Sequence, residues 1–452
     1  MHLALLLCLF ALPFSAHAQS DDTEYRGYYQ KEAVFGTTVY IREAGLRNKP
    51  VLFLVHGLGD AASDDWLPTI PALIADYHIF AFDLPGFGHS TRGNHLYSPT
   101  NYARFLKAMA DRLAPNQPLL LVGHSLGGGI LLRFGDLYPE RVRKLVLVDA
   151  AGILHRSSFA RHAAMARRAS SDSRSVAFAI DGASFNAWLG ELIADSESFS
   201  LPVDEVLQSR PLRKMFLRGR AERIAALALL QENFTVAIAH QQAPVSILWG
   251  ADDAVAPLRT GQLLAARLPQ AHLEVIEGAS HVPMKSHTQE FNRLLRQELT
   301  RSDYRRSDPP PSAVQPLGEC RKQENVRFSG RYRRIVIRDC TQVVLEDVEA
   351  EEIEIVRSHV RMLRGRITAP SGAAMRLEQA KLMATATDIH GEVGIDASQS
   401  DLDLAGMRIE SGREAIRSSD ESRLLISVSH LRSSMGERDL HGAFRIAAQT
   451  PL

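Results

Sequence analysis

The amino-acid sequence predicts an α/β unit with a doubly wound parallel sheet, followed by a C-terminal all-β solenoid. Three observations predict this fold class. Short, wholly apolar runs alternate with helical segments between about residues 33 and 300. A polar, proline-rich stretch follows at 301–317, and beyond it a pattern recurs at intervals of about 20 residues. The chain has 452 residues, which is too long for one typical domain.

The apolar runs of the first unit are expected to be strands buried on both faces, because each has four or five apolar residues without alternation. Helical spacing is found at Asn101–Leu113 and Thr288–Leu299. The expected strands are Val51–Val55, Ile79–Phe82, Leu119–Val122, Leu145–Val148, Val245–Trp249 and Leu273–Ile276.

The regular alternation stops between about residues 152 and 240. This part is rich in alanine, arginine and leucine at helical spacing, for example at Ala221–Leu230. An insertion of helices after a sheet strand lies above the carboxyl ends of the strands. We therefore expect a helical cap over a pocket at that edge of the sheet.

The first residues have the pattern of a secretory signal peptide. An apolar run, Met1–Leu12, is broken by Pro13 and followed by the small-residue motif Ala16-His17-Ala18. We expect residues 1–18 to be removed, which leaves 19–300 as the α/β domain of a periplasmic or secreted protein. The alternative is an uncleaved N-terminal anchor. No other stretch has the length of a membrane helix, so no membrane span is expected after cleavage.

Residues 318–452 carry the repeat. Segments with a small residue followed by alternating apolar positions begin at Ser358, Ala380, Ser400 and Ser422, with spacings of 22, 20 and 22 residues. The pattern resembles the short right-handed parallel β-helices of exported bacterial proteins. The alternative is a small β-sandwich. Solenoid faces often bind polymers or proteins, so this domain could have a polymer or protein partner, although the sequence indicates no particular ligand.

Two cysteines, Cys320 and Cys340, remain after signal cleavage. In an oxidising compartment they could form a disulfide, which would add roughly 3 kcal/mol of stability by the loop-entropy model. Two cysteines alone do not make a structural zinc site, which needs four ligands.

The charge balance argues against nucleic acid as a partner. Lysine plus arginine equals aspartate plus glutamate, at 52 each. The glycine-rich segment Asp83–Ser90 lacks the lysine of a phosphate-binding loop. We expect a small-molecule substrate and neither a cofactor nor a metal.

Ser125 has the setting of a catalytic nucleophile. It lies in Gly123-His124-Ser125-Leu126-Gly127, between an expected buried strand and a helical stretch. A serine in a sharp strand-to-helix turn needs small residues two before and two after it, and Gly123 and Gly127 occupy these positions. The hydroxyl then lies at the positive end of the helix.

A serine nucleophile needs a base, and the base needs an orienting acid. Asp252 and Asp253 follow the expected strand ending at Trp249, and His281 follows the next expected strand. Both loops leave the same edge of the sheet as Ser125.

From about residue 33 to 300 the chain resembles the α/β-hydrolase superfamily, near its ester hydrolases and carbon–carbon bond hydrolases. Five segments in order carry the resemblance: Val55–Gly59, Asp83–Ser90, the turn at Ser125, Trp249–Pro257 and Gly278–Pro283. It implies the order serine, acid, histidine, and it favours Asp253 over Asp252 as the acid.

The resemblance also implies the remaining roles. His281 matches the family base, whereas structural or surface positions are expected for His272 and His287. The backbone N–H groups of Leu126 and Leu58 would form the oxyanion hole. His56 is expected to hold its own turn.

The sequence thus predicts an exported serine hydrolase that cleaves a carboxylic ester or related acyl bond of a small molecule. Two alternatives use the same triad, namely an acyltransferase and a carbon–carbon bond hydrolase, because cap and pocket decide the substrate. A third is a non-catalytic binding or scaffold protein that uses its solenoid. Epoxide and haloalkane hydrolases are disfavoured, since those family members carry aspartate where this chain has Ser125.

Overall fold

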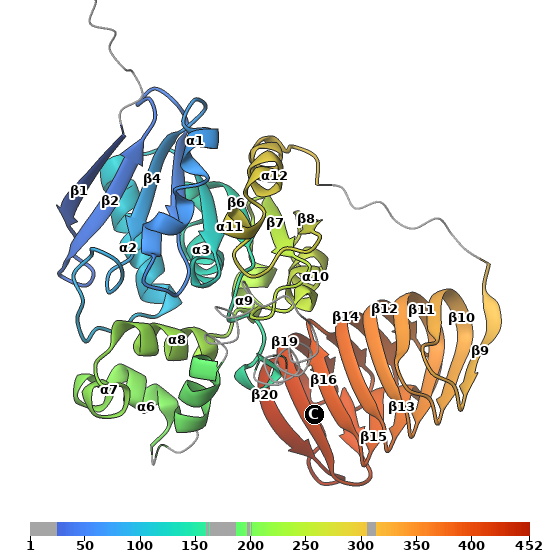
Figure 1. The fold of residues 1–452 in the computed structure, drawn as a ribbon. Coiled ribbons are helices and arrows are strands. Elements are labelled where there is room, and N and C mark those ends of the chain that lie inside the picture. Colours follow the sequence, from blue (N-terminus) through green and yellow to red (C-terminus); the bar gives the residue numbers. More distant parts are fainter. Residues whose placement is uncertain (1–24, 160–161, 163–186, 197–198, 200, 305–312) are drawn as a thin grey trace, which may run out of the picture.

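The computed structural model describes residues 25–159, 162, 187–196, 199, 201–304 and 313–452. The expected signal peptide lies outside these residues. The described chain forms a sheet with helices on both faces, a set of helices over one edge of that sheet, and an elongated β domain (Figure 1). The fold class predicted from the sequence is confirmed.

The first sheet is almost entirely parallel. Its strand order is β1-β2-β4-β3-β5-β6-β7-β8, and only the β1–β2 and β2–β4 pairs are antiparallel. The strands are β1 (Tyr25–Lys31), β2 (Thr38–Ala44), β3 (Val51–Val55), β4 (His78–Asp83), β5 (Leu119–His124), β6 (Val142–Val148), β7 (Val245–Gly250) and β8 (Ala271–Ile276).

Each expected apolar run lies within one of these strands, and both faces of the sheet are covered. In β3, Phe53 packs into one apolar cluster while its neighbours Leu52 and Leu54 pack into another. The first cluster includes residues of α2 (Pro99–Leu113), α3 (Leu126–Leu137) and α10 (Leu258–Arg267). The second includes residues of α1 (Ile70–Leu73), α11 (Pro283–Ser286) and α12 (Thr288–Thr300). Two short 3-10 helices are η1 (Ala62–Trp66) and η2 (Pro139–Arg141).

Helices occupy the described part of the expected cap segment. They include residues 187–196, α6 (Val203–Gln208), α7 (Arg210–Leu217), α8 (Ala221–Gln231) and α9 (Thr235–Ala239). Residues 160–161, 163–186, 197–198 and 200 of this segment lie outside the described chain. Helix α8 lies nearest the sheet domain, with α6 and α7 further out (Figure 1).

The C-terminal domain is β-solenoid-like. Its strands pair in parallel along the stack, except that β20 returns antiparallel to β19 at one end. The strands are β9 (Gln315–Arg321), β10 (Arg327–Arg338), β11 (Val343–Val356), β12 (His359–Thr368), β13 (Ala373–Glu378), β14 (Lys381–Gly391), β15 (Val393–Ser398), β16 (Asp401–Ala405), β17 (Arg408–Ser411), β18 (Ile416–Ser418), β19 (Ser422–Ser433) and β20 (Gly436–Ile446). Strand β9 begins inside the segment expected to be a linker.

The repeat in the sequence corresponds to stacked rungs. Val360, Leu382, Leu402 and Leu424 follow the four small residues by two positions, and they align in the pairings β12–β14–β16–β19. The small residues lie at buried corners, where the Ser400 hydroxyl accepts the Ala380 N–H and the Ser422 hydroxyl accepts the Ser400 N–H. A small hydroxyl therefore satisfies the backbone of the neighbouring rung, which explains the periodic serines.

A disulfide joins Cys320 in β9 to Cys340, which follows β10, with a Cα–Cα distance of 6.5 Å. Both residues are buried in the solenoid core. In the described residues no helix is both long enough and apolar enough to cross a membrane.

Candidate active site

Ser125 occupies a strained turn between β5 and α3. Its backbone angles are φ 52° and ψ −114°, and the residue is only 2% exposed. The turn requires glycine on both sides. A Cβ on Gly123 would lie 2.5 Å from the carbonyl oxygen of Gly127, and a Cβ on Gly127 would lie 2.3 Å from the carbonyl oxygen of Val55.

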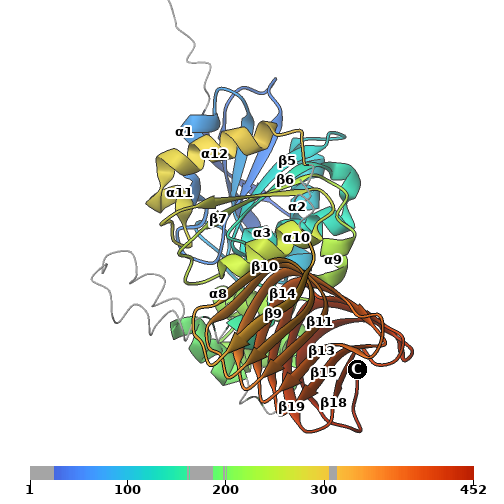
Figure 2. The same cartoon turned by 90° about the vertical axis from the view of Figure 1, so that its right-hand side faces the viewer.

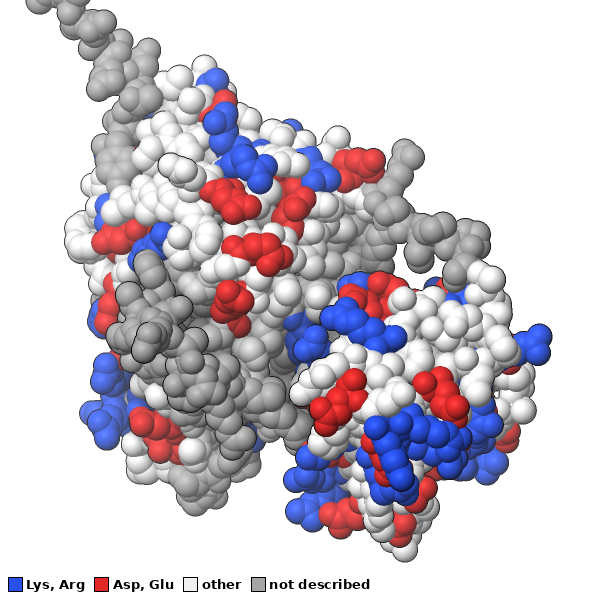
Figure 3. All heavy atoms as spheres, turned by 45° about the vertical axis from the view of Figure 1, so that its right-hand side comes forward, with Lys and Arg blue, Asp and Glu red and all other residues white. Residues whose placement is uncertain are grey.

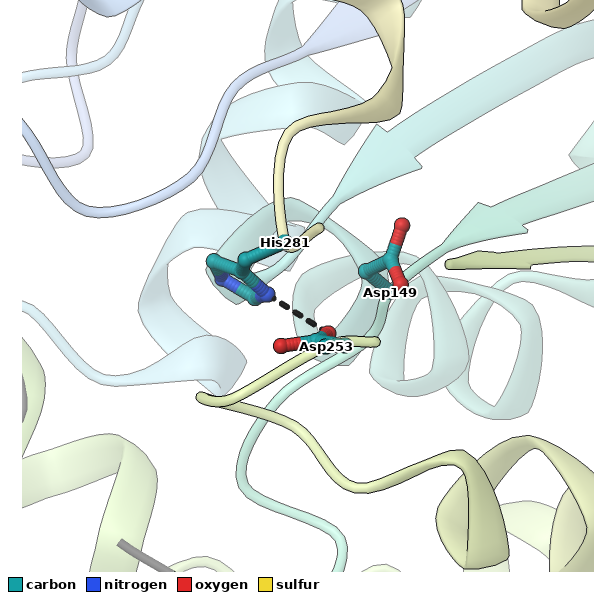
Figure 4. Close-up of side chains that lie close together, drawn as sticks. All are labelled: Asp149, Asp253 and His281. Atoms are coloured by element: carbon teal, nitrogen blue, oxygen red, sulfur yellow. Dashed lines mark hydrogen bonds and ion pairs between the residues drawn. The ribbon is translucent and has the colours of Figure 1, made fainter. Parts of the chain in front are cut away.

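His281 links Ser125 to a carboxylate. The Ser125 hydroxyl donates to Nε2 of His281 at 3.0 Å, and Nδ1 of His281 donates to Oδ2 of Asp253 at 2.8 Å. Figure 4 shows His281 and Asp253 facing each other from loops that follow different strands. Since a carboxylate only accepts, it places the imidazole proton on Nδ1 and leaves Nε2 free to receive the serine proton.

The structure places Asp253, and not Asp252, against His281. The Asp253 side chain is fully buried, and its Oδ1 accepts the backbone N–H groups of Val255 and Ala256 at 2.7 and 2.9 Å. Asp252 is exposed to solvent. The backbone bonds fix the Asp253 carboxylate, so that its second oxygen is held toward the imidazole.

The other histidines considered as bases lie away from Ser125. His272 is in β8 beside Glu274 and Glu298, and Nδ1 of His287 lies 3.1 Å from the Ser286 hydroxyl. Nε2 of His56 accepts the N–H of Leu84 at 2.9 Å, while its Nδ1 donates to the carbonyl of Gly57 at 2.7 Å. His56 therefore fastens the turn after β3 to the chain after β4.

The two residues expected to supply oxyanion donors adjoin the nucleophile. Leu126 follows Ser125 directly and begins α3, and Leu58 lines the same pocket as Ser125. The backbone at Gly57 also approaches closely, because a Cβ there would lie 2.8 Å from Cβ of Ser125.

The pocket over Ser125 is small and apolar. Its volume of about 10 Å³ is roughly that of a single water position. The serine hydroxyl is the one polar side-chain group among the described residues that line it. The lining residues are Leu58, Ser125, Ala151, Gly152, Phe159, Leu189, Ala226, Leu229, Leu230 and Val255. The lining is therefore apolar next to the nucleophile.

Two polar residues at the site were not identified from the sequence as part of it. His124 is buried, and its Nε2 donates to the carbonyl oxygen of His281 at 2.7 Å. Burial lowers the pKa of His124 to about 4, so the ring is a neutral donor at pH 7. His124 thus fixes the backbone of the residue that contacts Ser125. Its place directly before the nucleophile was the available signal.

Asp149 is the second polar residue of the site that was not identified from the sequence. It follows β6, is fully buried and has a positive φ of 44°. Its Oδ1 accepts the N–H of Gly250 at 2.9 Å. Burial and the neighbouring charge of Asp253 raise the pKa of Asp149 well above its usual range.

Two groups of side chains in the described residues have ligand-type atoms within 4.8 Å of one another. One consists of Asp149, Asp253 and His281, and here Asp253 and His281 bond to each other. The other consists of His272, Glu274 and Glu298, and Arg301 forms ion pairs with both glutamates. In both groups, atoms that could bind a metal therefore already bond to other residues of this chain.

Comparison with known proteins identifies the family. The model of the alpha/beta hydrolase fold matches residues 50–288, and the chain belongs to this family. The chain is 32% identical over 256 residues to a pimeloyl-[acyl-carrier protein] methyl ester esterase of Chromobacterium violaceum, covering 55% of this chain and 94% of the relative. It is 27% identical over 263 residues to Lipase 1 of Psychrobacter immobilis, covering 54% and 75%.

A solved hydrolase from Pseudomonas aeruginosa superposes with a TM-score of 0.46 at 21% identity, covering 61% of this chain and 99% of that one. An esterase from Exiguobacterium antarcticum superposes with a TM-score of 0.45 at 18% identity, covering 61% and 100%. The family and its esterase and lipase members support a hydrolase.

Proposed function

We propose that this protein is a serine esterase that acts through a covalent acyl-enzyme. The observation that carries the proposal is the continuous chain of hydrogen bonds from Ser125 through His281 to Asp253, with distances of 3.0 and 2.8 Å. A serine hydroxyl is a weak nucleophile by itself, and such a chain supplies both the base and the group that orients the base.

In the first half-reaction, Oγ of Ser125 would bond to the ester carbonyl carbon while its proton passes to Nε2 of His281. The tetrahedral oxyanion would be held by the N–H groups of Leu58 and Leu126. The bond from carbon to the alkoxy oxygen would then break, and His281 would return the proton to the leaving alcohol. Asp253 would stabilise the imidazolium throughout.

In the second half-reaction, water would attack the acyl carbon and give its proton to Nε2 of His281. The bond between the acyl carbon and Oγ of Ser125 would break, and the proton would return to Ser125. The product is a carboxylic acid, so the cycle needs no co-reactant other than water.

The pocket lining supports an ester with an uncharged, apolar acyl group. Phe159, Leu229 and Val255 line the space next to Ser125, and no described lining side chain carries a charge. A charged acyl group would lose its hydration there without gaining a partner.

We also propose that the protein acts outside the cytoplasm. The signal-like segment 1–18 and the disulfide between Cys320 and Cys340 support an oxidising compartment. The N-terminal sequence of the mature protein tests this, and we expect it to begin at Gln19. An exported protein that still carries residues 1–18 would contradict the proposed cleavage.

The esterase proposal is tested by turnover of p-nitrophenyl esters by the full chain. We expect Ser125→Ala to reduce kcat to the background rate, because the attacking oxygen is removed. Ser302→Ala is the matched control, since Ser302 is exposed and distant in sequence from the site, and should keep wild-type rates. Undiminished turnover in the Ser125 variant would overturn the proposal.

A further inference from the structure

The solenoid is packed into the hydrolase domain at one end. Helix α10 lies beside β14 (Figure 2), and α9 lies beside β19 and β20 (Figure 1). Ala405 and Val428 of the solenoid belong to the same buried apolar cluster as the hydrolase core. The two domains therefore share a core at this end of the stack.

Close backbone contact supports this packing. A Cβ on Gly406, which has a φ of +61°, would lie 2.8 Å from Cγ of Leu263 in α10. At the last residue of that helix, Nε of Arg267 donates to the carbonyl of Gly406 at 2.6 Å, and Arg267 forms an ion pair with Asp388 at 2.7 Å. The solenoid is thus fastened along α10.

A buried carboxylate of the solenoid lies at the other end of α10. Asp403 in β16 is only 2% exposed. Its Oδ1 accepts the hydroxyl of Ser158 at 3.2 Å and a guanidinium N–H of Arg259 at 3.1 Å. One solenoid side chain therefore holds together two hydrolase segments separated by about a hundred residues. A buried carboxylate is costly without partners, and Ser158 and Arg259 supply the partners of Asp403.

Both segments form walls of the pocket over Ser125. Ser158 directly precedes Phe159, which lines that pocket. Arg259 is the second residue of α10, which begins just after the loop that carries Asp253 and the lining residue Val255. A third contact lies nearby, where the N–H of His155 donates to the Ser427 hydroxyl at 2.9 Å.

The outward faces of the solenoid carry charges of both signs. Lysine and arginine are interspersed with aspartate and glutamate on the solenoid side (Figure 3). Ion pairs connect neighbouring rungs, for example Arg334 with Glu354 at 2.6 Å and Arg357 with Asp339 at 2.7 Å. These charges neutralise one another, whereas the Asp403 carboxylate faces the hydrolase domain.

We propose that Asp403 is a positioning residue which fixes the width of the acyl pocket, so that the solenoid forms part of the substrate-binding structure of the enzyme. The inference rests on the proposed esterase function. It assigns the C-terminal domain a role in acyl-chain selectivity. Without the Asp403 carboxylate, the segments bearing Phe159 and Val255 would separate and the pocket would accept longer chains.

The test compares acyl-chain selectivity in full-length variants. The measured quantity is the ratio of kcat/KM for p-nitrophenyl hexanoate to kcat/KM for p-nitrophenyl acetate. We expect this ratio to rise about tenfold in Asp403→Ala and in Arg259→Met, which is at the low end of the discrimination that a hydrophobic pocket achieves for one methylene group. Asp403→Asn keeps an oxygen acceptor and should give a smaller rise.

Asp388→Ala is the matched control. This variant also removes a solenoid carboxylate that pairs with α10, but it does so at Arg267, the end of the helix away from the pocket. We expect its ratio to equal that of the wild type, with a similar loss of thermal stability. A merely structural role for Asp403 would give the same unchanged ratio in both variants.

The outcomes separate the two proposals. If the wild type hydrolyses both esters and the ratio is unchanged in Asp403→Ala, Asp403→Asn and Arg259→Met, the positioning role is overturned and the esterase function stands. If the folded wild type hydrolyses neither ester, the esterase function fails and the positioning role fails with it. Should the alanine variant not fold, Asp403→Asn and Arg259→Met decide.

Discussion

Asp149 and Asp253 lie side by side next to His281, although they follow different strands of the sheet (Figure 4). Two ionised carboxylates this close in a buried site repel each other strongly. Asp253 accepts two backbone N–H groups and bonds to His281, whereas Oδ1 of Asp149 accepts one N–H, from Gly250. Burial and the adjacent Asp253 carboxylate therefore raise the pKa of Asp149 well above its usual range.

This arrangement predicts that Asp149 lowers the stability of the folded protein, and that this loss grows as the pH rises. The folded protein keeps Asp149 protonated at a pH where the unfolded chain has ionised it, because its pKa is raised on folding. The folded state then binds more protons, so stability falls as the pH rises above about 4, the ordinary aspartate value. Asp149→Asn cannot ionise, and we expect its Tm to rise relative to wild type from pH 4 to pH 8.

Asp149→Ala serves as the comparison, because it also removes the acceptor for the Gly250 N–H. Relative to Asp149→Asn, we expect it to be destabilised by about 1–3 kcal/mol at every pH in this range. Parallel Tm curves for wild type and Asp149→Asn would show that Asp149 is ionised in the folded protein.

Adjacent aspartates offer a matched pair for the catalytic acid. Asp253→Asn should lower kcat by roughly 10³–10⁴-fold, because an amide cannot stabilise the imidazolium and favours the wrong tautomer of His281. Asp252→Asn should remain within about twofold of wild type, since Asp252 is exposed and its change alters the barrier by less than about 0.5 kcal/mol. Steady-state kinetics on p-nitrophenyl esters measures both, and equal losses would contradict the assignment.

The buried His124 should make the folded protein less stable at acidic pH. Its pKa is lowered on folding from the ordinary 6.5 to about 4, chiefly by burial. The unfolded chain therefore binds a proton that the folded chain does not, and stability contributed by the neutral ring is lost as the pH falls from 6.5 to 4. His124→Gln keeps a side-chain N–H for the His281 carbonyl but cannot titrate.

We expect the Tm of His124→Gln to decline less steeply than that of wild type between pH 6.5 and pH 4. His124→Leu removes the donor and should lower kcat about tenfold, equivalent to about 1.4 kcal/mol. A kcat for His124→Leu equal to that of the glutamine variant would show that the bond to His281 does not position the base.

The disulfide should stabilise the solenoid without affecting catalysis. Cys320 lies in β9, at the opposite end of the stack from the hydrolase domain (Figure 1). Replacing both Cys320 and Cys340 by alanine should cost about 3 kcal/mol of stability by the loop-entropy model. Thermal unfolding with and without reductant measures this. An esterase rate that falls in the folded double variant together with its Tm would contradict a purely structural role of the disulfide.

The sequence predicted the buried strands well and the exposed ones poorly. The run Val51–Val55 is apolar throughout because helices cover both faces of β3. Strands β1 and β2 were not predicted. Arg26, Gly27 and Tyr29 of β1 are exposed, and β2 alternates buried with partly buried positions. An edge hairpin of this kind lacks a continuous apolar run.

The contact between the domains could not be predicted for a related reason. Asp401 and Asp403 share the outward face of β16, and the repeat pattern treats them alike. The hydrolase domain covers Asp403 with Ser158 and with Arg259 on α10. A pattern within one domain reports its own core, and it carries no information on which outward residue another domain will bury.

The nucleophile can be identified most directly by mass spectrometry of its covalent adduct. Full-length protein is incubated with a fluorophosphonate, digested, and mapped peptide by peptide. We expect one adduct, on the peptide that contains Ser125, and none after Ser125→Ala. An adduct on another residue, or none on folded protein that hydrolyses esters, would contradict the proposed mechanism.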